Sequence, residues 1–124
     1  MGLVYISATV SNDGQSATLQ FLVDSGAKYT LLPLDTWKAL GLEPIKSMRF
    51  VLADGTAIER NISECLITLP PHGSLHTPVI LGHGGDDALL GVITLEEFGL
   101  ILNPFQRTLE AARMMLAVMA SGQA

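Results

Sequence analysis

An acidic residue ends an apolar run in this sequence, at a place where a carboxylate is unusual. Residues 21–23 are Phe-Leu-Val, and Asp24 follows them directly, ahead of Ser25 and Gly26. A carboxylate at the end of a buried strand is costly unless hydrogen bonds or a function compensate for it. Gly26 permits a sharp turn and leaves its backbone N–H able to approach the acid. By themselves these residues fit an acid that caps a turn at the end of a strand better than they fit a functional carboxylate.

Other residue types that often do chemistry form weaker patterns here. His72 and His76 have the spacing of helical metal ligands, but the flanking prolines and glycine argue against a helix, and His83 lies apart. Residues 82–85 resemble a phosphate-binding loop only in their glycine content. Cys65 lies on an alternating strand, which indicates a buried structural thiol. We expect no metal and no cofactor, and a hydrolase that uses Cys65 or a histidine is the weakest alternative.

The elements around Asp24 follow from the spacing of apolar residues. Residues 4–10 alternate as one strand face, Asn12 to Gly14 form a turn, and residues 19–23 alternate on the return, so a hairpin leads directly into the acid. Residues Leu34 to Leu40 could form two turns of helix that Gly41 ends. The remaining predicted elements are strands at 29–32, 48–52, 58–66, 77–81 and 100–102, and a short helix at 93–98.

Turn-forming Gly, Pro, Asn and Asp recur about every ten residues, which favours a small all-β fold. We predict a closed, mostly antiparallel, barrel-like sheet with one short helix near the C-terminal end. Residues 1–124 are expected to form a single domain with its core at about 3–110. The tail is ambiguous, because Leu109, Ala111 and Arg113 alternate as a strand whereas residues 110–119 are rich in helix formers.

Residues 24–27, Asp-Ser-Gly-Ala, resemble the Asp-Thr/Ser-Gly-Ala signature of the retropepsin-like family of aspartic proteases. Downstream, Leu-Leu-Gly at 89–91 is similar to the hydrophobic-hydrophobic-Gly element of that family, and 89–100 is similar to its closing helix and strand. The segment 77–81 looks like the strand that feeds this element. The order and spacing agree over roughly residues 3–110.

The resemblance implies hydrolysis of internal peptide bonds by a water activated between two carboxylates, one ionised and one protonated. Only one Asp-Ser-Gly occurs in the sequence, so the second acid would come from the Asp24 of another copy in a homodimer. The pair shares one proton, and we expect the highest activity at mildly acidic pH.

Roles follow for the residues that match the family motifs. Asp24 would bind the water, Ser25 would hydrogen-bond across the dimer, and Gly26 would offer its carbonyl to the substrate backbone. Ala27 would line the first pocket. The hairpin at about 52–57 would close over an extended peptide that adds as a strand. The remaining residues expected to bind substrate are Ala53, Asp54, Gly55, Thr56 and Leu90, with Leu32 and Val79 as further pocket lining.

The sequence departs from the retroviral pattern at three places. The hairpin tip is Asp-Gly-Thr instead of an apolar, glycine-rich tip, Lys28 replaces an acid, and Val92 replaces an Arg or Asn. The usual brace of the dimer is therefore missing, and the tail at 105–124 is the candidate replacement. The polar tip also leaves open an alternative function, an inactive dimerisation or peptide-binding module with the same fold.

Bulk properties exclude several other classes of protein. The net charge is −5, so nucleic acid is not an expected partner, since phosphate binding needs a basic patch. No apolar stretch approaches the roughly 18 residues of a spanning helix, and the N-terminus lacks the pattern of a secretion signal. We expect a cytoplasmic protein whose partners are a second copy of itself and an extended peptide or protein substrate.

Overall fold

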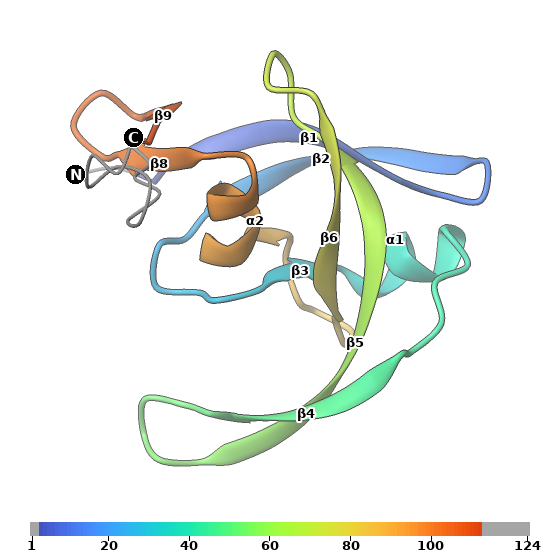
Figure 1. The fold of residues 1–124 in the computed structure, drawn as a ribbon. Helices are drawn as coiled ribbons and strands as arrows, with labels where there is room; N and C mark the ends of the chain where they lie inside the picture. Colours follow the sequence, from blue (N-terminus) through green and yellow to red (C-terminus); the bar gives the residue numbers. More distant parts are fainter. Residues whose placement is uncertain (1–2, 113–124) are drawn as a thin grey trace, which may run out of the picture.

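The computed structural model describes residues 3–112, which form nine strands and two short helices (Figure 1). In chain order the elements are β1 Tyr5–Asn12, β2 Gln15–Val23, β3 Thr30–Leu32, α1 Leu34–Ala39, β4 Lys46–Val51, β5 Ala57–Thr68, β6 Ser74–Leu81, β7 Leu89–Leu90, α2 Val92–Glu97, β8 Leu100–Asn103 and β9 Thr108–Ala111.

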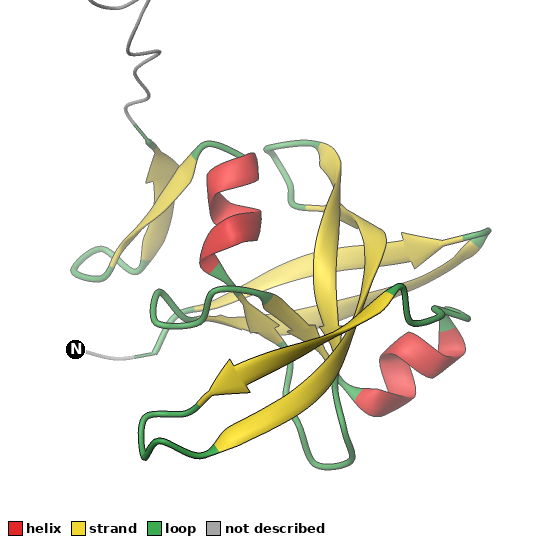
Figure 2. Cartoon of the chain, turned by 60° about the horizontal axis from the view of Figure 1, so that its bottom comes forward, coloured by secondary structure: helices red, strands yellow, loops and turns green. Residues whose placement is uncertain are grey.

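Seven strands form one curved sheet in the order β1-β2-β7-β3-β6-β5-β4. β1 also pairs with β5, so the sheet curls back on itself and encloses a core, as Figure 2 shows. Among the strands of the described residues, only the β2–β7 and β3–β6 pairs are parallel. The predicted all-β, mostly antiparallel, barrel-like fold is therefore confirmed. Both short helices expected from the sequence are present, since α1 forms where the apolar spacing allowed two turns of helix and α2 is the helix near the C-terminal end.

The first hairpin forms because its turn residues tolerate an unusual backbone conformation. Asn12 pairs with Gln15, and the two residues between them, Asp13 and Gly14, have φ angles of 49° and 83°. Asp and Gly are among the few residues that adopt such angles readily, and this turn matches the twist of the two strands. The return strand β2 then delivers the chain to Asp24, as the sequence predicted.

The core lies inside the curved sheet, where alternate side chains of each strand point. Cys65 belongs to this core, with 2% of its surface exposed, which confirms the prediction of a buried thiol. The largest side chains with almost no exposed surface include Phe21, Leu32, Leu40, Ile67, Leu69, Leu90, Val10 and Val79.

The C-terminal part of the described chain continues as a strand, which decides part of the ambiguity in the tail. β9 pairs antiparallel with β8, and the pairs run from Leu100–Ala111 to Asn103–Thr108. The two strands form a small second sheet beside α2 (Figure 2). The alternative, a helix at 110–119, falls mostly on residues outside the described part of the chain. Neither helix within residues 3–112 is long and apolar enough to cross a membrane.

Candidate active site

Asp24 lies in the loop between β2 and β3, where a short set of backbone hydrogen bonds fixes its position. Its N–H donates to the carbonyl O of Leu90 at 3.1 Å. The N–H of Gly26 donates to its Oδ1 at 2.9 Å, and the N–H of Ala27 donates to its carbonyl O at 3.1 Å. The carboxyl group is half-buried and oriented by a backbone donor, while Ser25 and Gly26 are exposed.

The Leu-Leu-Gly element holds this loop from the other side, although it lies far away in the sequence. β7 is inserted between β2 and β3, and Leu89 is the register partner of both Leu22 and Leu31. The chain then enters α2, whose first N–H groups bind the loop directly. The N–H of Val92 donates to the carbonyl O of Ala27, and the N–H of Ile93 donates to that of Lys28, both at 2.9 Å. The two motifs therefore form one unit.

Three buried threonine hydroxyls connect this unit to the sheet. Thr94 Oγ1 lies 2.6 Å from Thr30 Oγ1 and 2.7 Å from Thr77 Oγ1, and all three residues are at most 1% exposed. Thr30 Oγ1 also accepts a hydrogen bond from the N–H of Gly91 at 3.0 Å. The cluster joins α2, β3 and β6 through hydrogen bonds that water cannot replace, because the hydroxyls are sealed from solvent.

We expect Thr94→Val to lower the free energy of unfolding by about 2 kcal/mol, because it keeps the shape but leaves the buried Thr77 hydroxyl without a partner and the Thr30 hydroxyl with only the N–H of Gly91. Thr18→Val is the matched control, since Thr18 Oγ1 makes an exposed bond of 2.8 Å with Thr9 Oγ1 that water can replace. The control should change stability by less than about 0.5 kcal/mol. Urea denaturation at fixed protein concentration measures both. Equal changes in the free energy of unfolding for Thr94→Val and Thr18→Val would show that the threonine cluster does not stabilise the fold.

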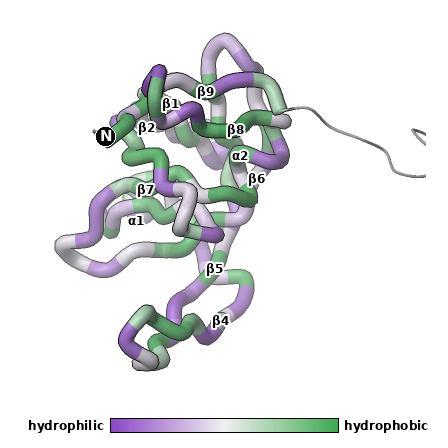
Figure 3. Tube along the Cα trace, turned by 90° about the vertical axis from the view of Figure 1, so that its left-hand side faces the viewer, coloured by the Kyte–Doolittle hydropathy of each residue, from purple (hydrophilic) through white to green (hydrophobic). Residues whose placement is uncertain are grey.

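The β4–β5 hairpin projects on the same side of the molecule as the Asp24 loop. Figure 1 shows its tip below that loop, and Figure 3, which faces this side, shows the hairpin extending away from β1, β2 and β8. Within the tip, the N–H of Leu52 donates to the carbonyl O of Thr56 at 2.7 Å, and the N–H of Thr56 donates to Asp54 Oδ1 at 2.9 Å. Hydrogen bonds from Thr56 lower the pKa of the Asp54 carboxyl. Ala53, Asp54, Gly55 and Thr56 are all exposed.

A groove of about 290 Å³ separates the hairpin from the Asp24 loop. Its hairpin side includes Phe50, whose ring meets that of Tyr29 edge-on with centroids 5.8 Å apart. The residues that line the groove are Gly26, Ala27, Lys28, Tyr29, Leu31, Phe50, Val51, Leu52, Ile58, Arg60, Ile80, Asp86 and Leu89. The groove is mainly apolar and open to solvent, and it passes directly over two residues of the Asp24 motif.

The prediction that Leu90 lines a substrate pocket is wrong for this groove. Leu90, like Leu32 and Val79, has no exposed surface. Neighbouring residues on a strand face opposite sides, and here the neighbouring residues Leu31, Ile80 and Leu89 line the groove. Leu31 is the register partner of both others, so these three form its floor while Leu90 lies in the core.

The remaining candidates from the sequence lie away from this groove or in the core. No three of the His, Cys, Asp and Glu side chains within residues 3–112 gather as metal ligands. Burial raises the pKa of the Cys65 thiol to about 12, so it stays protonated and unreactive at neutral pH. This finding argues against Cys65 as a nucleophile.

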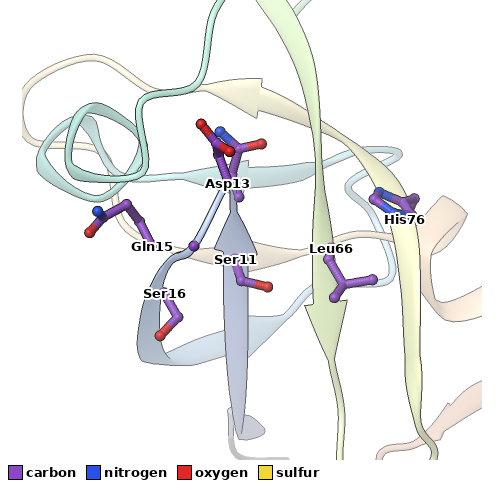
Figure 4. Close-up of a pocket in the computed structure, with 8 residues that line it drawn as sticks. Ser11, Asp13, Gln15, Ser16, Leu66 and His76 are labelled. Atoms are coloured by element: carbon purple, nitrogen blue, oxygen red, sulfur yellow. The ribbon is translucent and has the colours of Figure 1, made fainter.

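Another cavity on the described surface is also separate from Asp24. It has about 400 Å³ and lies at the turn of the β1–β2 hairpin, the opposite end of these strands from Asp24. Figure 4 shows Asp13, Gln15 and Ser16 on one side of it and His76 on the other. No carboxylate among the residues that line this cavity accepts a backbone N–H in the way that Asp24 accepts that of Gly26.

A comparison with known protein families decides which family this chain belongs to. Residues 6–92 of the 124 match the model of a family described as aspartyl protease. This chain belongs to the aspartyl protease family. The match includes the Asp24 loop, the β4–β5 hairpin and the Leu-Leu-Gly element. No curated protein matches the sequence.

The chain is also similar in structure to a retroviral protease-like domain, that of Ddi1 from Leishmania major. The TM-score is 0.56 with 15% sequence identity, and the likeness covers 92% of this chain and 91% of that one. At this identity the likeness shows the fold, which is retropepsin-like.

Several residues that line the groove were not expected from the sequence to belong to a site. Tyr29, Phe50, Ile58 and Arg60 were not assigned to a site, and Lys28 was noted only as a departure from the retroviral pattern. A signal existed for three of them, because Phe50, Ile58 and Arg60 occupy even positions of two paired strands and so share one face. Only the fold shows that this face looks toward Asp24.

Proposed function

We propose that the protein is a homodimeric aspartic endopeptidase, with the Asp24 carboxylates of the two subunits forming one catalytic pair. The observation that supports this most strongly is the Asp24 loop, in which a half-buried carboxyl group accepts the N–H of Gly26 at 2.9 Å and borders an open groove. The family match supports the same chemistry.

In this mechanism the two carboxylates share one proton and hold a water between them. The ionised carboxylate removes a proton from the water as it attacks the peptide carbonyl, and the protonated one donates to the carbonyl oxygen. The nitrogen of the cleaved bond then takes up the proton that the first carboxylate removed from the water. The former carbonyl oxygen returns its proton to the other carboxylate as the C–N bond breaks and the amine leaves. Ser25 would brace the pair across the dimer, and Gly26 and Ala27 would contact the substrate backbone and its first side chain. Ala53, Asp54, Gly55 and Thr56 of the tip would cover the bound peptide.

A second subunit is required because one chain provides a single acid of this kind within residues 3–112. Asp13 and Asp54 lie in exposed turns of hairpins. Apolar side chains are exposed on segments near the Asp24 end of the molecule, where they could pack against a partner: Leu3 is 65% exposed, Tyr5 55% and Ile101 52%. A hollow of about 320 Å³ beside Ser25 is also mostly apolar and is lined by α2 and β8. The tail proposed as a further brace includes residues 113–124, which lie outside the described part of the chain.

The dimer requirement is tested by diluting the enzyme. Cleavage of a denatured protein or a peptide library should show a specific activity that falls as the dimer dissociates, because a monomer has only one carboxylate. Analytical ultracentrifugation at the same concentrations gives the fraction of dimer. A monomer that retains full specific activity would contradict the proposal. The expected cytoplasmic location stays a prediction.

The polar hairpin tip supports one competing function, an inactive module that binds peptides. The wild-type protein would then bind extended peptides in the groove and cleave none of them at any pH between about 4 and 8. Peptide cleavage followed by mass spectrometry, with binding measured on the same peptides, separates the two functions.

A further inference from the structure

The groove under the β4–β5 hairpin has an excess of positive charge. Lys28, from the Asp24 loop, and Arg60, from β5, line the same cavity of about 290 Å³. Asp86 is the one carboxylate among its lining residues, and Asp86 Oδ2 already accepts the N–H of His83 at 2.8 Å. Two cations and one carboxylate give the groove a net charge of +1, whereas the whole chain has a charge of −5.

The register of the hairpin explains why Arg60 has no acidic partner. Arg60 lies opposite Met48, on the face that Phe50 and Ile58 also occupy. The nearest acid in the sequence, Glu59, points to the other face, opposite Arg49. The guanidinium of Arg60 donates only to the carbonyl O of Glu59, at 3.2 Å, and to no carboxylate within residues 3–112. Its donors remain available to a ligand in the groove.

Lys28 belongs to the part of the Asp24 loop that α2 holds by hydrogen bonds. Its carbonyl O accepts the N–H of Ile93, and its neighbour Ala27 is bound by Val92. The Lys28 side chain itself is exposed, and Arg60 is half-buried. One cation is thus fixed to the Asp24 loop, and the other is on the hairpin that would cover a peptide. A carboxylate that both cations bound in the groove would link the hairpin to the loop.

The rest of the groove is apolar. Leu31, Ile80 and Leu89 form its floor, and Tyr29 and Phe50 form part of its sides. We infer that the enzyme selects peptides with a Glu or Asp side chain in an otherwise apolar segment close to the cleaved bond. This inference rests on the proposed protease function. Lys28 and Arg60 are the residues that determine this selectivity. Charge-assisted hydrogen bonds to a carboxylate are stronger than neutral ones, and the planar guanidinium of Arg can bind both oxygens.

The test uses peptide pairs that differ only by Glu or Gln, placed in turn at each of three positions on either side of the cleaved bond. At one position or more, the kcat/KM of the Glu peptide should be about fivefold to tenfold higher than that of the Gln peptide, mainly because its KM is lower. The preference should shrink as salt is raised. Arg60→Gln and Lys28→Gln should each reduce the Glu/Gln ratio toward one. Arg49→Gln, on the outer face opposite Glu59, is the matched control and should keep the ratio.

The outcomes separate this inference from the protease function. Cleavage with no preference for Glu, or with a preference for Lys, overturns the inference and leaves the function intact. If the wild type cleaves nothing, the function fails, and binding of the same labelled peptides to Asp24→Asn by fluorescence anisotropy decides the inference. Tighter binding of the Glu peptides, lost in Arg60→Gln and kept in Arg49→Gln, supports it, while equal binding of Glu and Gln peptides overturns it.

Discussion

Asp24→Asn is expected to abolish peptide cleavage, with a loss of about 1000-fold or more in kcat, while the dimer and the fold persist. An amide has nearly the same shape as a carboxylate, and its oxygen can still accept the Gly26 N–H, which lies 2.9 Å from Asp24 Oδ1. It cannot remove a proton from water. Cleavage of a peptide substrate, with circular dichroism and ultracentrifugation of the same sample, measures both parts of the expectation.

Asp13→Asn is the matched control for this substitution. It makes the same change of carboxylate to amide in the β1–β2 turn, at the opposite end of the strands from Asp24, and Asn tolerates the φ of 49° found there. Cleavage by this variant should equal that of the wild type. Substantial activity in Asp24→Asn would mean that another group activates the water.

Mixing Asp24→Asn with wild-type subunits tests whether the two carboxylates act together. If one acid comes from each subunit, only dimers with two wild-type subunits are active. A mixture of equal parts should then have about one quarter of the activity of the same total concentration of wild-type protein. A fall to one half would indicate that each subunit works alone. The pH profile of the wild type is a separate check, because a shared proton requires activity to fall above neutral pH.

Gly91→Ala is expected to have the largest effect on stability, a loss of about 3 kcal/mol or more. A Cβ at this position would lie 2.4 Å from the carbonyl carbon of Tyr29, 2.5 Å from its oxygen and 2.8 Å from the nitrogen of Thr30. These are backbone atoms of the segment that enters β3, so they cannot move aside as a flexible side chain would. The methyl group would push β7 and α2 away from the Asp24 loop, and activity should fall together with stability.

Gly84→Ala is the appropriate comparison for Gly91→Ala. A Cβ at Gly84 would meet only Leu34 Cδ2, at 3.9 Å, which is an ordinary van der Waals contact. Denaturant unfolding and cleavage assays on both variants, at one protein concentration, measure the difference. If Gly91→Ala unfolds at the same denaturant concentration as Gly84→Ala, the close approach of Gly91 to Tyr29 is not what holds the loop in place.

Both predictions depend on the same arrangement, in which residues from two distant parts of the chain hold one carboxyl group. Leu90 accepts the N–H of Asp24, and Val92 donates to Ala27. The position of the Asp24 carboxyl group therefore depends on β7 and α2 as much as on the Asp24 loop itself. Catalysis needs such support, because a small displacement of a catalytic group costs a large part of the rate.

Local patterns in the sequence were sufficient to predict the hairpins and the acid at the end of β2. Alternation of apolar residues and the Asn-Asp-Gly turn involve neighbours along the chain, so these features require no knowledge of the fold. The same holds for Cys65, whose place on an alternating strand indicated burial. The chain also carries, in residues 24–27 and 89–91, the two short motifs that point to the family.

Only the tertiary structure decided which side chains meet at the groove. Leu89 and Leu90 are the same residue type, and β7 is only two residues long, so the sequence contains no signal for which of them faces the core. The charge of the groove was hidden for the same reason, since Lys28 and Arg60 are far apart along the chain. Which face of a strand is buried depends on the partners that distant segments supply, and these partners exist only once the sheet has closed around its core.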